Sequence, residues 1–365
     1  MKIVAGHILA LRLFDVAYAI DLPRAQILLA RHVSGQAVRS RLATTPPKAV
    51  AFDVPPLNVT LDLVVLDLDG VAVEAALTAR LYDFGAVTLA LRVPGAGLEW
   101  EGFSARVNAV DRVLEDTAFW DTRLEALRRT LAEALLRPST SRLTEDYLIG
   151  VVHQFDPAPS AAEMLDRLDL VPLLSGETRP LSNAARADLL RSRFSYYADD
   201  LVVLTWDRAF IYEPRGESDV ADVLEVANAQ LLEMRYYDEL LDAELPAMYD
   251  MVEGARRGLN VLAARRYAGL ARRLYTLVAE VTELTEKVDN ALQVSEDVYL
   301  ARVYAAALDG FRVPTFSAAV HRKLAIIRDT YTALYDEASA ARSEIMEAAI
   351  VLLIVVELVL ALVRH

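Results

Sequence analysis

Residues 201–212 read Leu-Val-Val-Leu-Thr-Trp-Asp-Arg-Ala-Phe-Ile-Tyr, and they lie where one kind of sequence pattern gives way to another. The apolar runs on either side of Trp206 and Asp207 predict a pair of strands. Upstream, short strand and helix patterns are mixed without the regular repeat of a doubly wound sheet. Downstream of Gly216 the strand patterns stop and long helical patterns begin. This order predicts an α+β fold, a mixed and largely antiparallel sheet domain followed by a long antiparallel helical hairpin.

The upstream region, residues 1–215, contains several further candidate elements. Turn residues separate apolar runs of strand length from amphipathic runs of helix length. Strands are predicted at residues 3–14, 61–67, 86–93 and 147–155, and helices at residues 73–82, 117–136, 160–168 and 183–192.

The downstream region is predicted to be helical throughout. A connecting helix, residues 216–255, is expected to run from about Asp219 to Glu253, with Ser218 as its cap and a kink at Pro246. In residues 256–345 apolar residues recur at alternating four- and three-residue steps, from 270 to 288 and again from 320 to 345. Such spacing is typical of a coiled coil. Gly310 and Pro314 separate the two seams, so a helical hairpin is predicted.

Residues 346–365 form a hydrophobic C-terminal segment, which is apolar from Ala348 to Val363 apart from Glu357. A helix from residue 345 to 363 is just under about 30 Å long, close to the thickness of a bilayer's hydrocarbon core. We therefore predict a transmembrane tail anchor that contacts the lipid bilayer through residues 346–363. The alternative is a helix buried in protein, such as the core of an oligomer. In either case Glu357 is a candidate intramembrane or oligomer contact, since a buried acid needs a partner or a proton.

Lysine is scarce while arginine and alanine are abundant, a bias typical of a GC-rich genome, so we expect a bacterial source. With the tail, this predicts a protein at the bacterial inner membrane, with most of the chain on the cytoplasmic side. The N-terminal apolar stretch is interrupted by His7 and Arg12, so a strand is expected there and no cleaved signal peptide. The chain has no cysteine, which excludes disulfides and thiolate chemistry. Its formal net charge of −14 argues against direct DNA binding.

One motif resembles a catalytic loop. Residues 64–70, Val-Val-Leu-Asp-Leu-Asp-Gly, resemble the nucleophile loop of haloacid-dehalogenase-type phosphatases, in which Asp67 and Asp69 would act on phosphorus. No lysine lies between Lys48 and Lys287 to balance the phosphate charge, and the expected α/β repeats are missing. A strand that ends in an acidic turn is therefore the preferred interpretation. The five histidines are scattered without ligand spacing, and neither a catalytic residue, a cofactor nor a metal is predicted.

A run of arginine pairs is the clearest candidate interaction surface. No acid lies between Glu253 and Glu280, so these arginines form a local positive patch in an acidic chain. The patch could contact lipid headgroups or RNA phosphates, or the arginines could pair with acids of the preceding helix. The residues are Arg256, Arg257, Arg265, Arg266, Arg272 and Arg273.

Residues 200–214, with Tyr236-Tyr237-Asp238, resemble the "required for meiotic nuclear division" family, also called domain of unknown function 155. Residues 81–87, Leu-Tyr-Asp-Phe-Gly-Ala-Val, are similar to that family's aromatic–glycine–valine strand. The resemblance implies a membrane-associated protein that supports translation by holding ribosomes, and it implies no catalytic residue. We therefore expect a non-enzymatic, membrane-tethered scaffold or adaptor that forms homo-oligomers and contacts a ribosome or another protein. The alternative is an enzyme or binding domain for a phosphorylated or nucleotide ligand in the α+β body.

Overall fold

The computed structural model divides the chain into two compact units. Unit 1 comprises Met1–Tyr236 and Lys287–Pro314, and unit 2 comprises Tyr237–Glu286 and Thr315–His365. The four-part division expected from the sequence stays a prediction. The residues that the structure describes are 1–32, 38–39, 51–52, 54–216, 219–256, 269, 271–276, 278–279, 281–283, 292–293 and 297–363.

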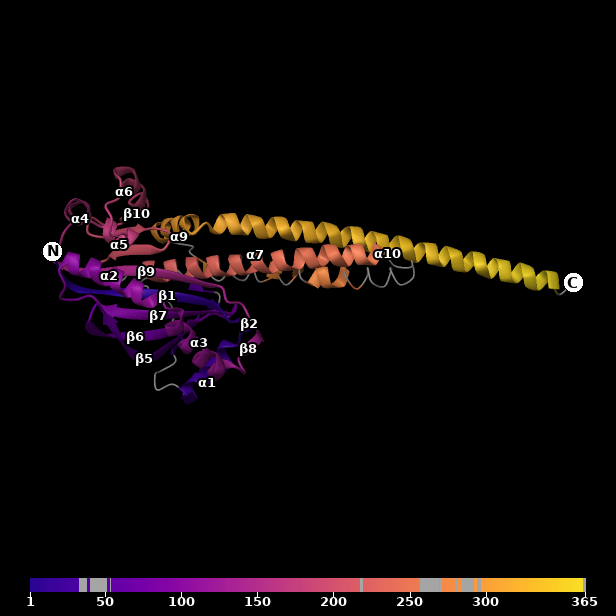
Figure 1. The fold of residues 1–365 in the computed structure, drawn as a ribbon, viewed down its shortest axis with the longest axis horizontal. Coiled ribbons are helices and arrows are strands. Elements are labelled where there is room, and N and C mark those ends of the chain that lie inside the picture. The colour runs from indigo at the N-terminus through magenta and orange to yellow at the C-terminus, as the bar shows by residue number, and fades with distance from the viewer. Residues whose placement is uncertain are drawn as a thin grey trace. The chain divides into compact units, whose positions relative to one another are not determined.

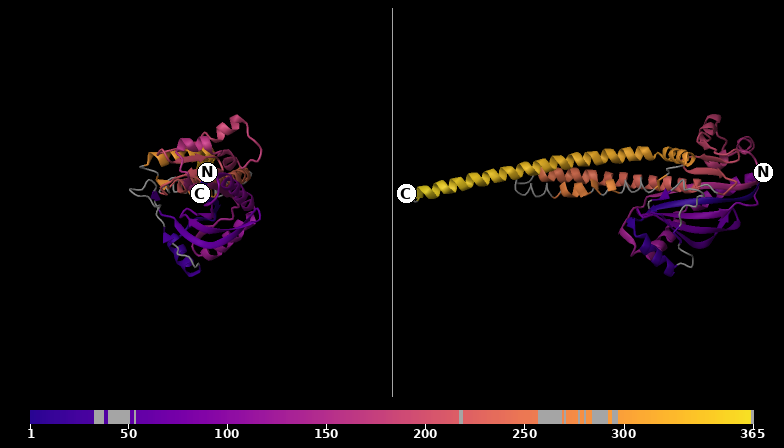
Figure 2. Two further views of the ribbon diagram at one scale, coloured as in Figure 1. Left: turned by 90° about the vertical axis from the view of Figure 1, so that its left-hand side faces the viewer. Right: turned by 180° about the vertical axis from the view of Figure 1, so that it is seen from behind.

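Unit 1 is built on one large sheet (Figures 1 and 2). Among the described strands, neighbours in this sheet run antiparallel except for one central pair, residues 144–156 and 208–212, which is parallel. The predicted α+β class, with a mixed and largely antiparallel sheet followed by long helices, is confirmed. The strands in spatial order are β10 (Arg193–Phe194), β11 (Leu201–Leu204), β12 (Arg208–Tyr212), β9 (Thr144–Asp156), β1 (Lys2–Asp15), β7 (Ala86–Pro94), β6 (Val71–Leu81), β5 (Leu57–Leu68) and β3 (Val38–Arg39).

Among the described residues, two short strand pairs lie outside this sheet. The first pairs β2 (Ala17–Ile20) with β8 (Leu135–Pro138), and the second pairs β4 (Ala51–Phe52) with β13 (Leu292–Gln293).

The hairpin of β5 and β6 corrects one helix prediction. Its two-residue turn is Asp69-Gly70, with φ values of 54° and 83°, as a tight hairpin turn requires. Residues 73–82 were expected to form a helix, and that prediction is wrong. Their alanines favour a helix locally, but β6 pairs along one edge with β5 and along the other with β7, and this pairing outweighs the local propensity.

Replacing Gly70 with alanine should destabilise the protein by about 1–2 kcal/mol, measured by urea unfolding. An added Cβ at Gly70 meets nothing within 4 Å, so the cost arises from its positive φ alone. Gly102 is the matched control, because it lies inside a helix and its added Cβ is also unobstructed. There alanine should leave stability unchanged or raise it by up to about 1 kcal/mol. Equal losses at both positions would contradict this account of the turn.

One face of the sheet is covered by helices of unit 1. Phe103 and Val107 share a continuous buried apolar cluster with Leu89 and Leu91 of β7. The helices predicted at residues 160–168 and 183–192 are present, whereas the one predicted at 117–136 ends at Leu131. Apart from α7 (Val220–Arg256), the helices described in unit 1 are α1 (Leu22–His32), α2 (Trp100–Leu114), α3 (Thr117–Leu131), α4 (Ala161–Arg167), α5 (Val171–Ser175), α6 (Asn183–Leu189) and α9 (Val298–Gly310). Of these, α9 contacts α7 through the hydrogen bond from Tyr304 to Gln230.

The first turns of α7 (Val220–Arg256) pack on the opposite face of the sheet. The hydroxyl of Tyr82, at the end of β6, donates a hydrogen bond to Glu225 at 2.8 Å. Asn228 donates to the backbone oxygen of Asp146 in β9 at 3.3 Å. The connecting helix predicted from Asp219 to Glu253 is confirmed, and Pro246 lies inside it.

The described part of unit 2 contains the rest of α7, residues 271–283 in part, and α10 (Val313–Val363). Lys323 of α10 contacts Asp238 of α7, with 2.7 Å between Nζ and Oδ1. The coiled-coil hairpin over residues 256–345 is not established. Most of its first arm lies outside the described residues, and residues 298–310 form the separate helix α9 in unit 1.

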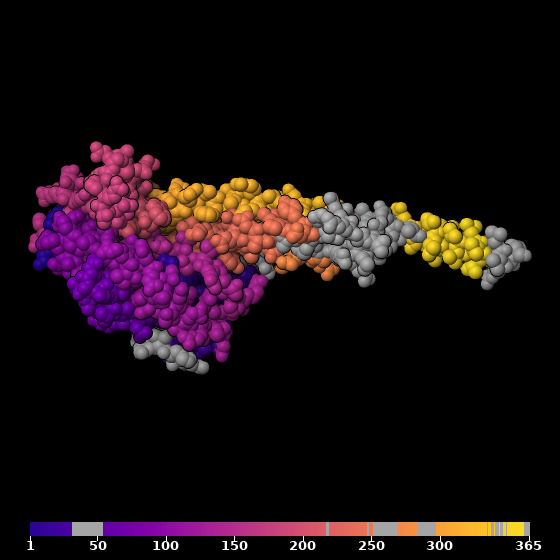
Figure 3. Space-filling view, viewed as in Figure 1, coloured from indigo at the N-terminus to yellow at the C-terminus, as the bar shows by residue number. Residues whose placement is uncertain are grey.

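The prediction of a transmembrane tail anchor and a membrane localisation is wrong. Within the described residues, no helix is both long enough and apolar enough to cross a membrane. The apolar stretch from Ala348 to Val363 makes only about 24 Å of helix, less than the hydrocarbon core of a bilayer, and Glu357 interrupts it. Residues 350–360 of this segment, which Figure 3 shows in yellow, are exposed.

Candidate anion-binding cleft

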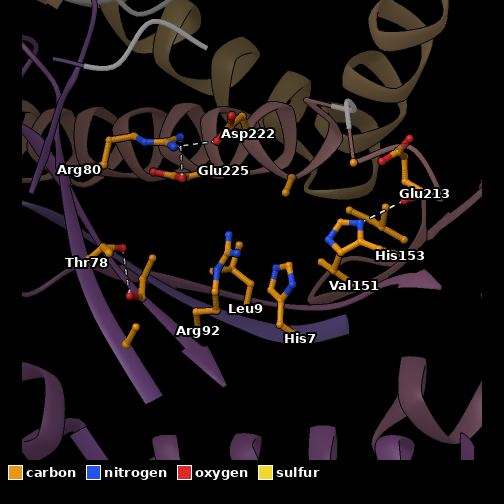
Figure 4. A pocket seen from close by; sticks show the side chains of 15 residues that line it. His7, Leu9, Thr78, Arg80, Arg92, Val151, His153, Glu213, Asp222 and Glu225 are labelled. Atoms are coloured by element: carbon orange, nitrogen blue, oxygen red, sulfur yellow. Dashed lines mark hydrogen bonds and ion pairs between the residues drawn. The ribbon is translucent and has the colours of Figure 1, made fainter. Parts of the chain in front are cut away.

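Unit 1 contains a cleft between the sheet and the first turns of α7 (Figure 4). Its volume is about 460 Å³, which is within the range of small-molecule sites. Strands β1, β6, β7, β9 and β12 form its floor, while α7 and the loop before it form a wall. The charged and polar lining residues used below are His7, Thr78, Arg80, Arg92, His153 and Glu225.

Strand register brings these residues together. Arg92 of β7 lies directly opposite Ala76 of β6 on one side and Leu9 of β1 on the other. Directly opposed residues of antiparallel strands point to the same face, and their sequence neighbours point to the other. Leu91 and Val93 are accordingly buried in the core beneath the sheet. Arg92 therefore faces the cleft, where its side chain rises towards α7 (Figure 4).

The Arg80 guanidinium forms a charged network at one end of the cleft. It pairs with Asp222 at 2.7 Å and Glu225 at 2.8 Å, and its Nε donates to Asn58 Oδ1 at 2.9 Å. Burial raises the pKa of Glu225, although the Arg80 charge opposes that shift. Both carboxylates are therefore compensated within the protein.

Two imidazoles lie beside Arg92. The ring centroids of His7 and His153 are 5.5 Å apart, and His153 Nδ1 contacts the backbone oxygen of Glu213 at 3.0 Å. Burial, the charge of Arg92 and the neighbouring His153 lower the pKa of His7 to about 3. His7 is thus neutral at pH 7 and can offer either an N–H donor or a lone pair.

Arg92 gives this end of the cleft a positive potential. It makes no ion pair among the residues that the structure describes, unlike Arg80. The Glu213 carboxylate accepts the backbone N–H of Arg215 at 3.1 Å, and Figure 4 shows it turned away from the two imidazoles. An anion bound between Arg92 and His7 would therefore meet one uncompensated cation and neutral donors.

The partly buried, neutral His7 makes stability depend on pH. Its folded-state pKa lies below its unfolded value of about 6.5, so its contribution is complete above pH 6.5 and is lost as pH falls towards 3. Between pH 7.5 and pH 5 this loss should be about 2 kcal/mol in the free energy of unfolding. His7→Gln should remove that part of the slope in urea unfolding at the two pH values. If the free energy of unfolding changes with pH equally in the variant and the wild type, His7 is not held neutral by the fold.

Comparison with known proteins places the chain in a family. Residues 5–219 match the family model described as "Uncharacterized protein MJ0711, N-terminal domain". The chain belongs to this family. It is similar to the uncharacterized protein MJ0711 of Methanocaldococcus jannaschii, with 25% identity over 196 residues. The alignment covers 53% of this chain and 59% of that relative, so the chain matches little more than half of the relative's length. No solved structure matches the chain.

The MJ0711 N-terminal domain match includes every strand that forms the cleft floor and stops just before Ala221, Asp222 and Glu225 of α7. The matched family and relative do not carry the name "required for meiotic nuclear division", and the coarser assignment to the MJ0711 N-terminal domain family is the one shown.

The acidic motif of this MJ0711 family member is a structural turn. Asp67 Oδ1 accepts the N–H of Gly70 at 2.8 Å, which stabilises the β5–β6 hairpin. Asp69 forms an exposed ion pair with Arg112 of α2 at 2.9 Å. The preferred interpretation, a strand ending in an acidic turn, is confirmed, and neither residue lies in the cleft.

The predicted arginine patch and Glu357 lie in unit 2. Arg257, Arg265 and Arg266 lie outside the described residues, as does the side chain of Arg256. Arg272 and Arg273 are exposed, and Arg273 pairs with Glu244 of the preceding helix at 3.0 Å. Glu357 is exposed on α10. No described helix could carry it across a membrane, and its role as an oligomer contact stays a prediction.

Sequence reasoning missed the cleft residues. His7, Arg92 and His153 are far apart in the chain, and the spacing of the histidines indicated no shared site. Within the described residues no group of three or more potential metal-ligating side chains is present. The available signal was the presence of Arg80 and Arg92 at alternate positions of otherwise apolar strands. That signal is weak, because a charged residue in a strand is as consistent with a sheet edge or a salt bridge as with a ligand site.

Proposed function

We propose that the α+β body is a binding domain for a small ligand that carries a phosphate or a similar dianion, held in the cleft. The observation that carries this proposal is Arg92, a cation that faces the cleft without a carboxylate partner among the described residues. An arginine guanidinium offers several donors in a planar arrangement that suits phosphate oxygens.

The surroundings of Arg92 support the same ligand chemistry. Neutral His7 can donate to an oxyanion without adding further charge. The cleft's own acids, Asp222 and Glu225, are already bound to Arg80 and so repel an anion less than free carboxylates would. The volume of about 460 Å³ leaves room for more than a bare phosphate.

Titration of the protein with inorganic phosphate and pyrophosphate tests the proposal. Isothermal calorimetry should detect saturable binding at constant ionic strength, whereas potassium chloride should produce none. The pKa of His7, followed by NMR of its imidazole, should rise when phosphate binds, because the anion offsets the charge of Arg92. Absence of saturable binding in the millimolar range, together with an unchanged His7 titration, would refute the proposal.

We propose an adaptor rather than an enzyme as the wider role, with translation as its setting. The support for this role is the resemblance of residues 200–214 and Tyr236-Tyr237-Asp238 to the "required for meiotic nuclear division" family. Contact between exposed Arg272 and ribosomal RNA would be electrostatic, so co-sedimentation with ribosomes should weaken steeply as salt is raised. Salt-insensitive co-sedimentation, or none at low salt, would count against this role.

A further inference from the structure

The cleft continues along one row of the sheet onto an exposed apolar surface. Leu63 of β5 is directly opposite Ala76 of β6, and Ala76 is directly opposite Arg92 of β7. These three side chains therefore lie on the same face of the sheet. Adjacent strands are about 4.8 Å apart, so Leu63 is about 10 Å from Arg92 across the sheet.

Leu63 and its neighbour Val65 are unusually exposed for apolar residues on a sheet. Their exposed fractions are 66% and 68%. Leu66 and Leu68 of the same strand point to the opposite face, where they belong to the buried core. The strand-opposite partner of Val65 is the exposed Glu74. The sheet thus presents an apolar strip that starts at Ala76 beside Arg92 and is bordered by an acid at its far end.

We propose that the ligand is an amphiphilic anion, in which a phosphate group binds Arg92 and a single apolar chain lies over Ala76 on Leu63 and Val65. This inference rests on the proposed function, because the phosphate must occupy the cleft for the chain to follow the strip. Charge complementarity fixes the head at Arg92, and continuity of the row fixes the direction of the chain. Glu74 disfavours a second anionic group at the far end of the ligand.

A series of monoalkyl phosphates, used below their micelle-forming concentrations, tests the inference. Inorganic, ethyl, butyl, hexyl and octyl phosphate should bind with dissociation constants that fall roughly two- to fourfold for each added CH₂ group. The double variant Leu63→Asn/Val65→Asn should abolish this dependence on chain length while leaving the dissociation constant of inorganic phosphate unchanged. Because both side chains are exposed, the variant is expected to fold, which its circular dichroism and NMR spectra check.

Val71 supplies the matched control. It is exposed by 55% but lies directly opposite Leu68, so it is on the other face of the sheet. Val71→Asn should keep the full chain-length dependence.

The outcomes separate this inference from the proposed function. If inorganic phosphate binds but the dissociation constant does not depend on the length of the alkyl chain, the inference is overturned and the binding function stands. If neither phosphate nor any alkyl phosphate binds, both are overturned. A chain-length dependence that persists in the Leu63/Val65 variant would show adsorption elsewhere and overturn the inference. Octyl phosphate that binds an Arg92→Gln variant as tightly as it binds the wild type would overturn it too. The inference is also overturned if the wild-type dissociation constants do not depend on chain length and the Leu63/Val65 variant sediments more slowly than the wild type. That result would assign the strip to contacts between copies of the chain.

Discussion

Arg92→Gln should weaken phosphate binding about 10- to 100-fold while leaving the fold and its stability nearly unchanged. The substitution removes one charge-assisted interaction with the ligand, which is worth about 1.5–3 kcal/mol. It breaks no ion pair among the described residues, so the free energy of unfolding should change by less than about 0.5 kcal/mol. Isothermal calorimetry with inorganic phosphate and urea unfolding measure the two effects separately.

Arg112→Gln is the control for this experiment. Arg112 carries the same charge but lies on α2, on the other face of the sheet, where it pairs with exposed Asp69. The control variant should bind phosphate within about twofold of the wild type, since an exposed remote charge is screened at physiological salt. Equal weakening in both variants would mean that binding responds to net charge rather than to the cleft.

The Arg92 variant also tests the electrostatics of His7. The charge of Arg92 contributes to the depressed pKa of His7, after the larger effect of burial. Removing that charge should raise the His7 pKa part of the way towards 6.5. An unchanged His7 titration would show that the two side chains do not share one site.

Arg80→Met should be the most destabilising substitution at the cleft, lowering the free energy of unfolding by about 3–5 kcal/mol at pH 7. Arg80 is the cationic partner of both Asp222 and Glu225, and the Glu225 side chain is only 6% exposed. Without the guanidinium, Glu225 must stay charged in a buried site or take up a proton. The measurement is urea unfolding of the variant beside the wild type.

The pH dependence identifies the cause of that loss. The folded-state pKa of Glu225 is already raised by burial, and removing Arg80 raises it further. An acid whose folded pKa is raised contributes stability at low pH and loses it as pH rises through that pKa. The deficit of Arg80→Met should therefore shrink as pH falls from 8 towards 5. Arg112→Met, which breaks an exposed pair, should cost no more than about 1 kcal/mol at any of these pH values.

The spacing of apolar residues along the chain predicts those strands and helices whose buried positions recur at a regular interval. The long strand β1, the β11–β12 pair and the helix α7 were all predicted near their observed bounds, because the apolar period of each matches its structure. The pattern failed at residues 73–82, where alanine-rich sequence suited a helix and only pairing with β5 and β7 made a strand. It failed again at the C-terminal segment, where apolar composition suggested a span but no described helix is adequate to form one.

The candidate site depended on contacts that no local pattern contains. A charged residue in a strand is equally consistent with an edge, a salt bridge or a ligand site, so Arg80 and Arg92 look alike in the sequence. The tertiary structure separates them, since α7 supplies two carboxylates to Arg80 and none to Arg92. The same packing places His7 beside His153, although 145 residues separate them along the chain.

The sequence by itself determined the order of the secondary-structure regions along the chain, with a sheet-forming region up to Tyr212 and long helices after Gly216. It also excluded cysteine chemistry. It could determine that order because hydrophobic period and turn residues act over short distances along the chain. Only the tertiary structure decided that β6 is a strand and that Arg92 faces a cleft without a carboxylate partner among the described residues. Those outcomes depend on which distant segments pair with a strand or pack over it, and burial and charge compensation exist only after that packing has formed.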